Sequence, residues 1–366
     1  MRSYIKIALV IIGALIGAGF ASGQEIYLFF FSYGIRGIYG IIISSIILGI
    51  IIYKTITIIK KNNVTTYKEF LVSIIPKNLK NEKVLEIINA IINIFILITF
   101  YIMIAGFGGY LSETVEIPQI IGSSILAVIC IIIMLKETKG IVNVSELIVP
   151  ILIIFIAIIG IYTATSINIV NKIKEIETIK NSSWLVSGII YSSYNSILLI
   201  PVLISLNKII KQKEISQISI IISTIVLTLA ISIFISMLKI DINIKMLEMP
   251  VSYVIIKHLP KFKMLYGIVI LTSILTTAIS LIAGLLQNVK KTKNKKVILY
   301  LICISSIPIS KIGFSALIKF IYPIFGYIGI LQIILIGLRT QKHNKWIIKT
   351  LPFLIFYSKI KTSKEK

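Results

Sequence analysis

Ten long apolar stretches follow one another along the chain, separated by shorter segments that hold most of its charged residues. An α-helix needs roughly 20 predominantly apolar residues to cross the ~30 Å hydrocarbon core of a bilayer, and the stretches have about this length. They predict helices at residues 4–31, 35–59, 84–112, 118–135, 141–164, 184–206, 215–238, 264–289, 297–312 and 313–338. A weaker stretch, 346–357, contains Lys349 and Pro352, and we expect it to lie at the membrane surface. The pattern predicts an all-α integral membrane protein with about ten spans.

Composition supports this class of protein and limits which partners we expect. Of the 366 residues, 57% are hydrophobic and only 14% are charged, which is far from the composition of a soluble domain. The net charge of +24 does not indicate nucleic-acid binding, because the lysines lie in loops and form no basic face. The expected partners are therefore the lipid bilayer and a small solute, and no feature of the sequence indicates an oligomeric state.

The distribution of lysine and arginine predicts the orientation. If the N-terminus is cytoplasmic, the cytoplasmic segments hold 27 of the 38 Lys and Arg residues. Such an excess is typical of cytoplasmic loops. We therefore expect a multi-pass protein of the cell membrane with both termini inside and the first apolar stretch retained as a span, not cleaved as a signal peptide.

The spacing of the predicted helices repeats at an offset of about 180 residues. The first helix starts near Tyr4 and the sixth near Trp184, and the third and eighth show the same displacement. Five helices per unit is an odd number, so the second unit enters the membrane from the opposite side, as in inverted-topology repeats. The predicted organisation is a first repeat at 1–164, an external linker at 165–183, a second repeat at 184–338 and a basic cytoplasmic tail at 339–366 that contains the short apolar segment.

Two of these helices contain polar or glycine-rich interruptions at mid-depth. In the first helix the interruption is Gly17-Ala18-Gly19, and in the sixth it is the polar run from Tyr191 to Ser196. Inverted-repeat transporters bind solutes where such helices are broken, because the freed backbone groups can bind polar ligands there. We predict a break in both helices, with Ser192, Ser193 and Asn195 contacting the solute. The alternative for the glycines is close helix packing through small residues.

The residues that follow the first interruption predict a helix start. Ser22-Gly23-Gln24-Glu25 has the S-x-x-E spacing of a capping box, in which serine and glutamate side chains pair with each other's amides. Ser22 is also a candidate solute contact at the end of this interruption. Glu25 has two interpretations: it caps this helix, or it is an ionisable gating or coupling group, since charged residues inside a membrane are costly and often functional.

Hydroxyl side chains gather on one face of the predicted helix at 264–289. Ser273, Thr276, Thr277 and Ser280 have the i, i+3, i+4, i+7 spacing of one helix face. Their oxygens suit a hard cation such as sodium, whereas the alternative is that each bonds back to its own helix. Tyr101 lies near mid-depth of the helix at 84–112 and is a candidate solute contact or an interhelical hydrogen-bond donor. Between the seventh and eighth helices, the partly apolar segment 250–256 predicts an external lid, in a loop that also contains Asp241.

Together these features resemble a known family. The string GAGFASGQEI near the N-terminus, the ten spans and the YSSYN run in the sixth span are similar to the YkvI-like amino-acid permeases. This group in turn resembles the amino acid, polyamine and organocation superfamily, whose fold is the LeuT-type arrangement of two five-helix repeats. The resemblance implies a sodium ion held by the carbonyls of Gly13, Ile16 and Ser273 and by the hydroxyls of Thr276 and Thr277.

The expected function is secondary transport of a small polar solute, with an amino acid as the expected substrate. Neither a phosphate-binding G-x-x-x-x-G-K-[ST] motif nor a nucleophile or His/Asp constellation is present, so we expect an ion gradient as the driving force and no enzymatic activity. Sodium and proton coupling both stay open. The alternative is a permease-like sensor that binds a small molecule without moving it.

Overall fold

A computed structural model describes residues 3–76, 81–135, 139–169, 171–172, 182–287 and 292–339, and within these ranges every regular element is helical. Each predicted apolar stretch has a helical counterpart whose ends agree within about five residues. The helices are α1 (Ser3–Leu15), α2 (Ala18–Ala21), α3 (Gln24–Phe29), α4 (Arg36–Lys61), α5 (Tyr67–Ile74), α6 (Glu82–Val115), α7 (Gln119–Leu135), α8 (Lys139–Ser166), α10 (Trp184–Ser205), α11 (Ile215–Met237), α12 (Pro250–His258), α13 (Lys263–Gln287), α14 (Thr292–Ile309) and α15 (Phe314–Arg339).

Seven of the helical segments in the described ranges are long and apolar enough to cross a membrane. They are Arg36–Lys61, Glu82–Val115, Val149–Ser166, Trp184–Ser205, Gln212–Met237, Pro260–Leu286 and Phe314–Arg339. Helices α1 and α7 are apolar but shorter. The chain is therefore a multi-pass membrane protein, as the sequence predicted. The assignment of ten spans, the pairing of two five-helix repeats and the cytoplasmic location of both termini stay predictions.

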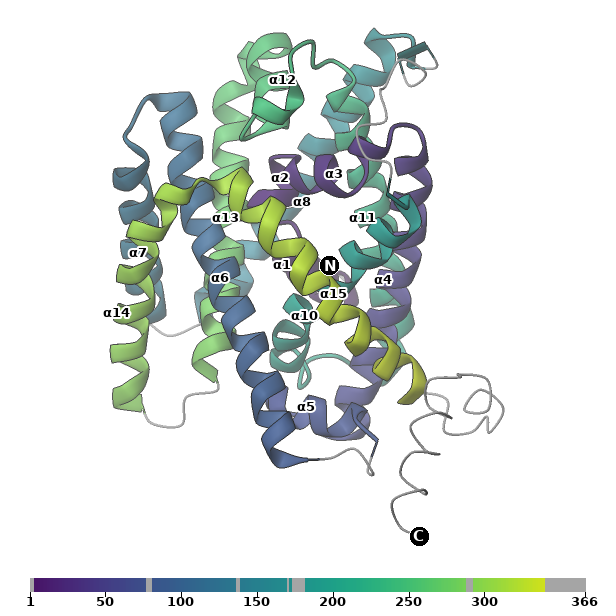
Figure 1. Cartoon of the computed structure of the whole chain (residues 1–366), viewed down its shortest axis with the longest axis vertical. Coiled ribbons are helices and arrows are strands. Elements are labelled where there is room, and N and C mark those ends of the chain that lie inside the picture. The colour runs from purple at the N-terminus through teal and green to yellow at the C-terminus, as the bar shows by residue number, and fades with distance from the viewer. Residues whose placement is uncertain are drawn as a thin grey trace.

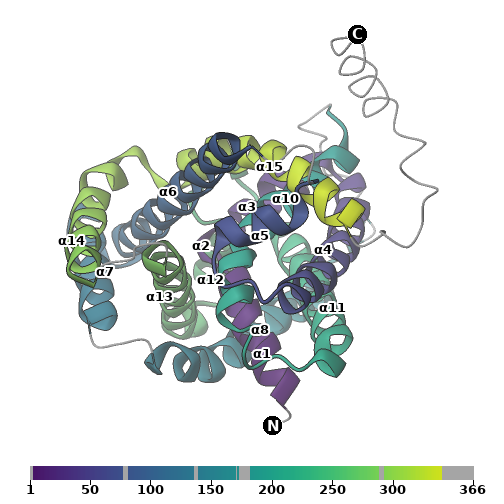
Figure 2. The same ribbon diagram turned by 90° about the horizontal axis from the view of Figure 1, so that it is seen from below.

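The helices form one bundle (Figures 1 and 2) in which α1 packs against α8, α10, α11 and α13. Helix α10 packs against α4 and α15. In both views α7 and α14 lie together at one side of the bundle, next to α6. The short helices α5 and α12 lie at opposite ends of the bundle in Figure 1. This arrangement places the interrupted first helix between the helices from both halves of the sequence.

The predicted break in the sixth helix is wrong, because α10 runs without interruption from Trp184 to Ser205. Its polar side chains bond to carbonyls of their own helix: Ser193 Oγ donates to the Ile189 carbonyl at 2.6 Å, and Asn195 Nδ2 donates to the Tyr191 carbonyl at 3.0 Å. Serine and asparagine can satisfy themselves in this way inside a continuous helix. A polar run in a membrane helix therefore does not require a break.

Two other predicted segments fall wholly or largely outside the described residues. The apolar stretch at 346–357, in the predicted tail 339–366, lies outside them, as do residues 170 and 173–181 of the predicted linker.

Helix α5 is joined to the bundle by a buried chain of hydrogen bonds. The hydroxyl of Tyr67 on α5 donates to Gln332 Oε1 on α15 at 2.6 Å, and Gln332 Nε2 donates to Ser196 Oγ on α10 at 3.2 Å. All three side chains are buried. The chain therefore links α5, α15 and α10 in an apolar setting, where an unpaired polar atom is costly.

Replacing Tyr67 with phenylalanine should destabilise the protein by about 1–3 kcal/mol, because Gln332 Oε1 would lose its buried donor. The measurement is the thermal unfolding midpoint of the purified protein in detergent. Tyr327→Phe is the matched control, since Tyr327 lies on α15 but is 61% exposed. Equal midpoints for Tyr67→Phe and Tyr327→Phe would contradict the prediction.

Candidate functional site

The first helix is interrupted where the glycines predicted it. Helix α1 ends at Leu15, Ile16 and Gly17 are not helical, and α2 begins at Ala18. A helix end leaves backbone carbonyls without amide partners, and inside a membrane these must be satisfied by other groups. Here the partners come from α13: Thr277 Oγ1 donates to the Gly13 carbonyl at 3.2 Å, and Ser273 Oγ donates to the Ile16 carbonyl.

The five residues predicted to hold a cation therefore lie together. Besides the two contacts between α13 and α1, Thr276 Oγ1 donates to the Ser273 carbonyl at 3.0 Å, within α13. The three hydroxyl side chains are buried. The cluster contains only oxygen donors, which is the ligand chemistry of hard cations. The carbonyls of Gly13, Ile16 and Ser273 and the hydroxyls beside them are thus gathered at the helix break.

Met103 of α6 also lies beside this break. A β-carbon added at Gly17 would lie 3.2 Å from Thr277 Cγ2 and 3.3 Å from Met103 Sδ. Both contacts are tighter than ordinary van der Waals distance, so α6 and α13 approach the backbone of Gly17 closely. Met103 was not a sequence-predicted site residue, because a methionine in an apolar helix carries no signal of its position.

A second turn of the chain separates α2 from α3. Gly23 has φ +87°, in the left-handed region that favours glycine, and it is the N-cap of α3. The predicted capping box is therefore wrong. Ser22 Oγ accepts from the Gln24 amide at 3.3 Å, the Ser22 amide is already bonded to the Ala18 carbonyl, and Glu25 bonds elsewhere.

Glu25 folds back over the interrupted helix. Its carboxylate accepts a hydrogen bond from the Tyr194 hydroxyl of α10 and is only 4% exposed. A β-carbon added at Gly19 would lie 2.3 Å from Glu25 Oε1, so the absence of a side chain at Gly19 makes room for the carboxylate. Glu25 thereby connects α2, α3 and α10.

Aromatic rings enclose the bond between Glu25 and Tyr194. The ring of Tyr194 is stacked on Tyr322 of α15, with centroids 4.6 Å apart, and on Phe29 of α3 at 5.5 Å. Tyr191 packs edge-on against Tyr194 at 5.5 Å. Sequence reasoning did not select Tyr194 as a site residue. Helical periodicity places Tyr194 on the same face of α10 as Leu198 and Pro201, which point toward α1, but periodicity alone does not identify Glu25 as its partner.

The other predicted solute contacts lie away from the break. Ser192 Oγ donates to the Ser44 carbonyl of α4 at 3.0 Å, whereas Ser193 faces α15, where its carbonyl approaches Gly329. The Asn195 side chain bonds within α10. On α6, the Tyr101 hydroxyl lies 2.7 Å from Ser305 Oγ of α14. In this conformation the structure brings Gly17, Ala18, Gly19, Ser22 and Glu25 together, but not Ser192, Ser193, Asn195 and Tyr101.

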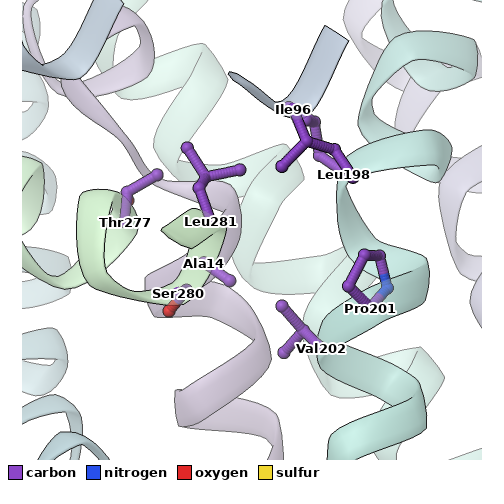
Figure 3. A pocket seen from close by; sticks show the side chains of 8 residues that line it. All are labelled: Ala14, Ile96, Leu198, Pro201, Val202, Thr277, Ser280 and Leu281. Atoms are coloured by element: carbon purple, nitrogen blue, oxygen red, sulfur yellow. The ribbon is translucent and has the colours of Figure 1, made fainter. Parts of the chain in front are cut away.

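A small cavity adjoins the cation-site residues (Figure 3), lined by Ala14, Ile96, Leu198, Pro201, Val202, Thr277, Ser280 and Leu281. It lies between α1, α6, α10 and α13. Its volume of about 10 Å³ is close to what a single water molecule needs. In this conformation the helices therefore pack tightly on this side of the break.

The opposite side is covered by the segment between α11 and α13. The Val251 amide of α12 donates to the Ser22 carbonyl at 2.9 Å, and the Gln24 side-chain amide donates to the Leu247 carbonyl. Helix α12 lies above α2 in Figure 1. The segment predicted as an external lid therefore contacts the turn between α2 and α3 directly, whereas its movement as a lid stays a prediction.

An exposed ion pair joins two parts of this covering segment. Lys257 Nζ and the Tyr253 hydroxyl, both on α12, donate to Asp241, which precedes α12. These bonds lower the pKa of the Asp241 carboxyl from 3.8 to about 2. Since the folded-state pKa is depressed, the stabilisation is fully present above pH 3.8 and is lost as the pH falls through about 2.

Asp241 is the only aspartate in the sequence, so carbon-13 labelling of aspartate gives a single side-chain carboxyl signal to follow by NMR. Its titration midpoint should lie near pH 2 in the wild type and move up toward the ordinary aspartate value of about 3.9 in Lys257→Met. An unchanged midpoint in the variant would show that Lys257 does not stabilise the carboxylate.

Comparison with known proteins places the chain among membrane proteins. No family model matches it. The membrane protein YkvI of Bacillus subtilis (strain 168) is 27% identical over 333 residues, which cover 89% of this chain and 92% of YkvI. The protein YyaD of the same organism is 24% identical over 335 residues, which cover 90% of this chain and 94% of YyaD. Both matches extend over nearly the whole length of each protein.

Among solved structures, two mutants of the manganese transporter of Eremococcus coleocola match with a TM-score of 0.52. They are 13% and 12% identical and cover 92% of this chain and 76% of the transporter. At this identity the likeness concerns the fold alone. The chain thus has a helical fold that is also found in a membrane transporter.

Proposed function

We propose that the protein is a secondary active transporter that moves a small polar solute, with an amino acid as the expected substrate, by alternating access. The observation that carries the proposal is the interruption between α1 and α2, where the carbonyls of Gly13 and Ile16 meet the hydroxyls of Thr277 and Ser273. Non-helical backbone inside a membrane persists only where protein groups or a ligand satisfy it. The transporter fold of the structural neighbours is consistent with this role.

The cluster at the break is the proposed site of the coupling ion. Its oxygens from Gly13, Ile16, Ser273, Thr276 and Thr277 suit Na⁺, if the hydroxyls turn their lone pairs toward the ion. Proton coupling through Glu25 is the second possibility for the driving ion. Among the described residues, no three His, Cys, Asp or Glu side chains lie close enough to hold a metal ion together, so manganese is not part of the proposal.

The solute site is proposed along the backbone from Gly17 to Ser22. This segment lies between two turns, at Gly17 and at Gly23, and is contacted by α6, α12 and α13. Ser192, Ser193, Asn195 and Tyr101 would contact the solute only in a conformation in which α10 and α6 have moved relative to α1. The proposed orientation has both termini in the cytoplasm and the segment containing α12 outside.

The test is uptake of radiolabelled amino acids by proteoliposomes that contain the purified protein, with an inward Na⁺ gradient, an inward proton gradient or neither. The proposal expects accumulation that depends on one of the two gradients. Binding of an amino acid without flux under any gradient would contradict transport and favour the sensor. Accumulation that is independent of both gradients would contradict secondary active transport.

A further inference from the structure

Glu25 is a buried carboxylate without a cationic partner among the described residues. The ion pairs in the described ranges join Lys68 to Glu82 and Glu86, and Lys257 to Asp241, and none includes Glu25. Its neighbours on α10 and α15 are the tyrosines Tyr191, Tyr194 and Tyr322. The chain thus places a carboxyl group, 4% exposed, where its hydrogen-bond donor among the described residues, the Tyr194 hydroxyl, is uncharged.

When it is ionised, this carboxyl group gains most from a positive charge that arrives from outside the chain. A buried charge is costly unless it is paired and hydrogen-bonded, and a neutral donor compensates it less than a cation does. The position of Glu25 limits where this cation would sit. Glu25 Oε1 lies against Gly19, at the segment from Gly17 to Ser22 that the proposed function assigns to the solute.

The size of the partner follows from the same geometry. The rings of Phe29 and Tyr322 stack on the ring of Tyr194, whose hydroxyl bonds to Glu25, and this crowding favours a compact cation. An ammonium group is compact and has three donors, so it can replace the Tyr194 hydroxyl on one carboxylate oxygen and donate to backbone carbonyls of the interrupted helix with the others.

We propose that Glu25 is the specificity-determining residue for an ammonium group on the transported solute. The solute class is therefore amines and amino acids with a free amino group, whereas N-acylated analogues and simple carboxylates are excluded. The inference rests on the proposed function, because it uses the same site. It also gives the Glu25–Tyr194 bond a role: the ammonium displaces Tyr194 from Glu25 and so removes this link between α10 and α3.

The experiment measures binding to the purified full-length protein by thermal shift and isothermal titration. The probes are the twenty L-amino acids, their N-acetyl derivatives and the corresponding decarboxylated amines. In the wild type, free amino acids or amines should bind at least about tenfold more tightly than their N-acetyl derivatives, as expected for losing a charge-assisted hydrogen bond. N-acetyl derivatives that bind as tightly as their parents would overturn the inference.

Variants separate this role from a structural one. Glu25→Gln should lose at least about tenfold in affinity for the ammonium-bearing probes and lose the preference over N-acetyl derivatives. Glu25→Asp, which keeps the charge, should retain the preference. Tyr194→Phe should retain it too, because Tyr194 is displaced on binding. Glu214→Gln is the matched control, since Glu214 is also buried, at 8% exposure, but lies before α11.

Two results would overturn the inference and leave the proposed function standing. The first is gradient-driven uptake of N-acetyl derivatives or carboxylates at the rate of the free amino acids. The second is a Glu25→Gln protein that keeps the ammonium preference but loses proton dependence, which would make Glu25 a proton carrier. Because the wild-type preference is measured independently, the inference stays falsifiable even if Glu25→Gln fails to fold. Failure of uptake for every probe under every gradient would instead overturn the proposed function.

Discussion

Replacing Gly19 with leucine should reduce solute uptake at least about tenfold and up to about 100-fold. A β-carbon at this position would lie 2.3 Å from Glu25 Oε1 and 2.9 Å from Glu25 Cγ, so the carboxylate must move. Its hydrogen bond with Tyr194 would then break, and the leucine side chain would occupy the segment proposed to bind the solute. Extra methylenes in a close-packed site cost about 1–3 kcal/mol, which corresponds to about this range of rates.

The measurement is initial-rate uptake in proteoliposomes, normalised to the amount of folded protein by size-exclusion chromatography. Gly109→Leu is the control, because a β-carbon at Gly109 on α6 meets nothing within 4 Å. Uptake by Gly19→Leu at the rate of Gly109→Leu would show that the segment around Gly19 does not bind the solute.

The long helices could be predicted from sequence because each is an apolar run with a length fixed by the bilayer, whereas the short helix α5 has no such run. The break after Leu15 could also be predicted, since Gly17 and Gly19 stand beside the polar residues Ser22 and Glu25. The spacing of glycine and polar residues thus identifies where a helix stops. It does not identify how the next helix starts: Gly23 takes the left-handed conformation and becomes the cap, which displaces the predicted Ser22–Glu25 pairing.

The wrong prediction for the sixth helix has the opposite cause. The run from Tyr191 to Ser196 is as polar as the first interruption, but its hydroxyl and amide groups reach carbonyls of the preceding turn. Glycine has no side chain with which to do this. In this chain, glycine therefore indicated a break where serine and asparagine did not.

The site itself depends on contacts between distant parts of the sequence. Glu25 and Tyr194 are 169 residues apart, and Ser273 and Ile16 are 257 apart. The second pair followed from the family resemblance, whereas nothing in the sequence indicated the first. Periodicity tells which residues share a face of α10, but it does not tell which neighbour that face meets.

Removing the two hydroxyls that bond to α1, in Ser273→Ala with Thr277→Val, should raise the Na⁺ concentration for half-maximal uptake at least about tenfold. In the proposed site the Thr277 hydroxyl is a ligand of the ion, whereas the Ser273 hydroxyl holds the Ile16 carbonyl, another ligand, in place. The variant therefore loses one ligand and the positioning of a second, and the ion's affinity falls with the number of ligands. The side chains also bond to the Gly13 and Ile16 carbonyls in this conformation, so their loss leaves two buried acceptors without donors.

These two effects are separable by measuring uptake against Na⁺ concentration and thermal stability without Na⁺ in the same variants. Lower stability with an unchanged Na⁺ dependence would show that the hydroxyls only satisfy the interrupted helix and bind no ion. Thr272→Val is the matched control, because Thr272 is on α13 but only half-buried, and its hydroxyl donates to carbonyls of its own helix at 2.6 and 3.0 Å. We expect Thr272→Val to keep the wild-type Na⁺ dependence, since the Thr272 hydroxyl bonds to its own helix and not to the interrupted first helix. A tenfold rise in the half-maximal Na⁺ concentration for the double variant, but not for Thr272→Val, would therefore place the coupling ion between α1 and α13.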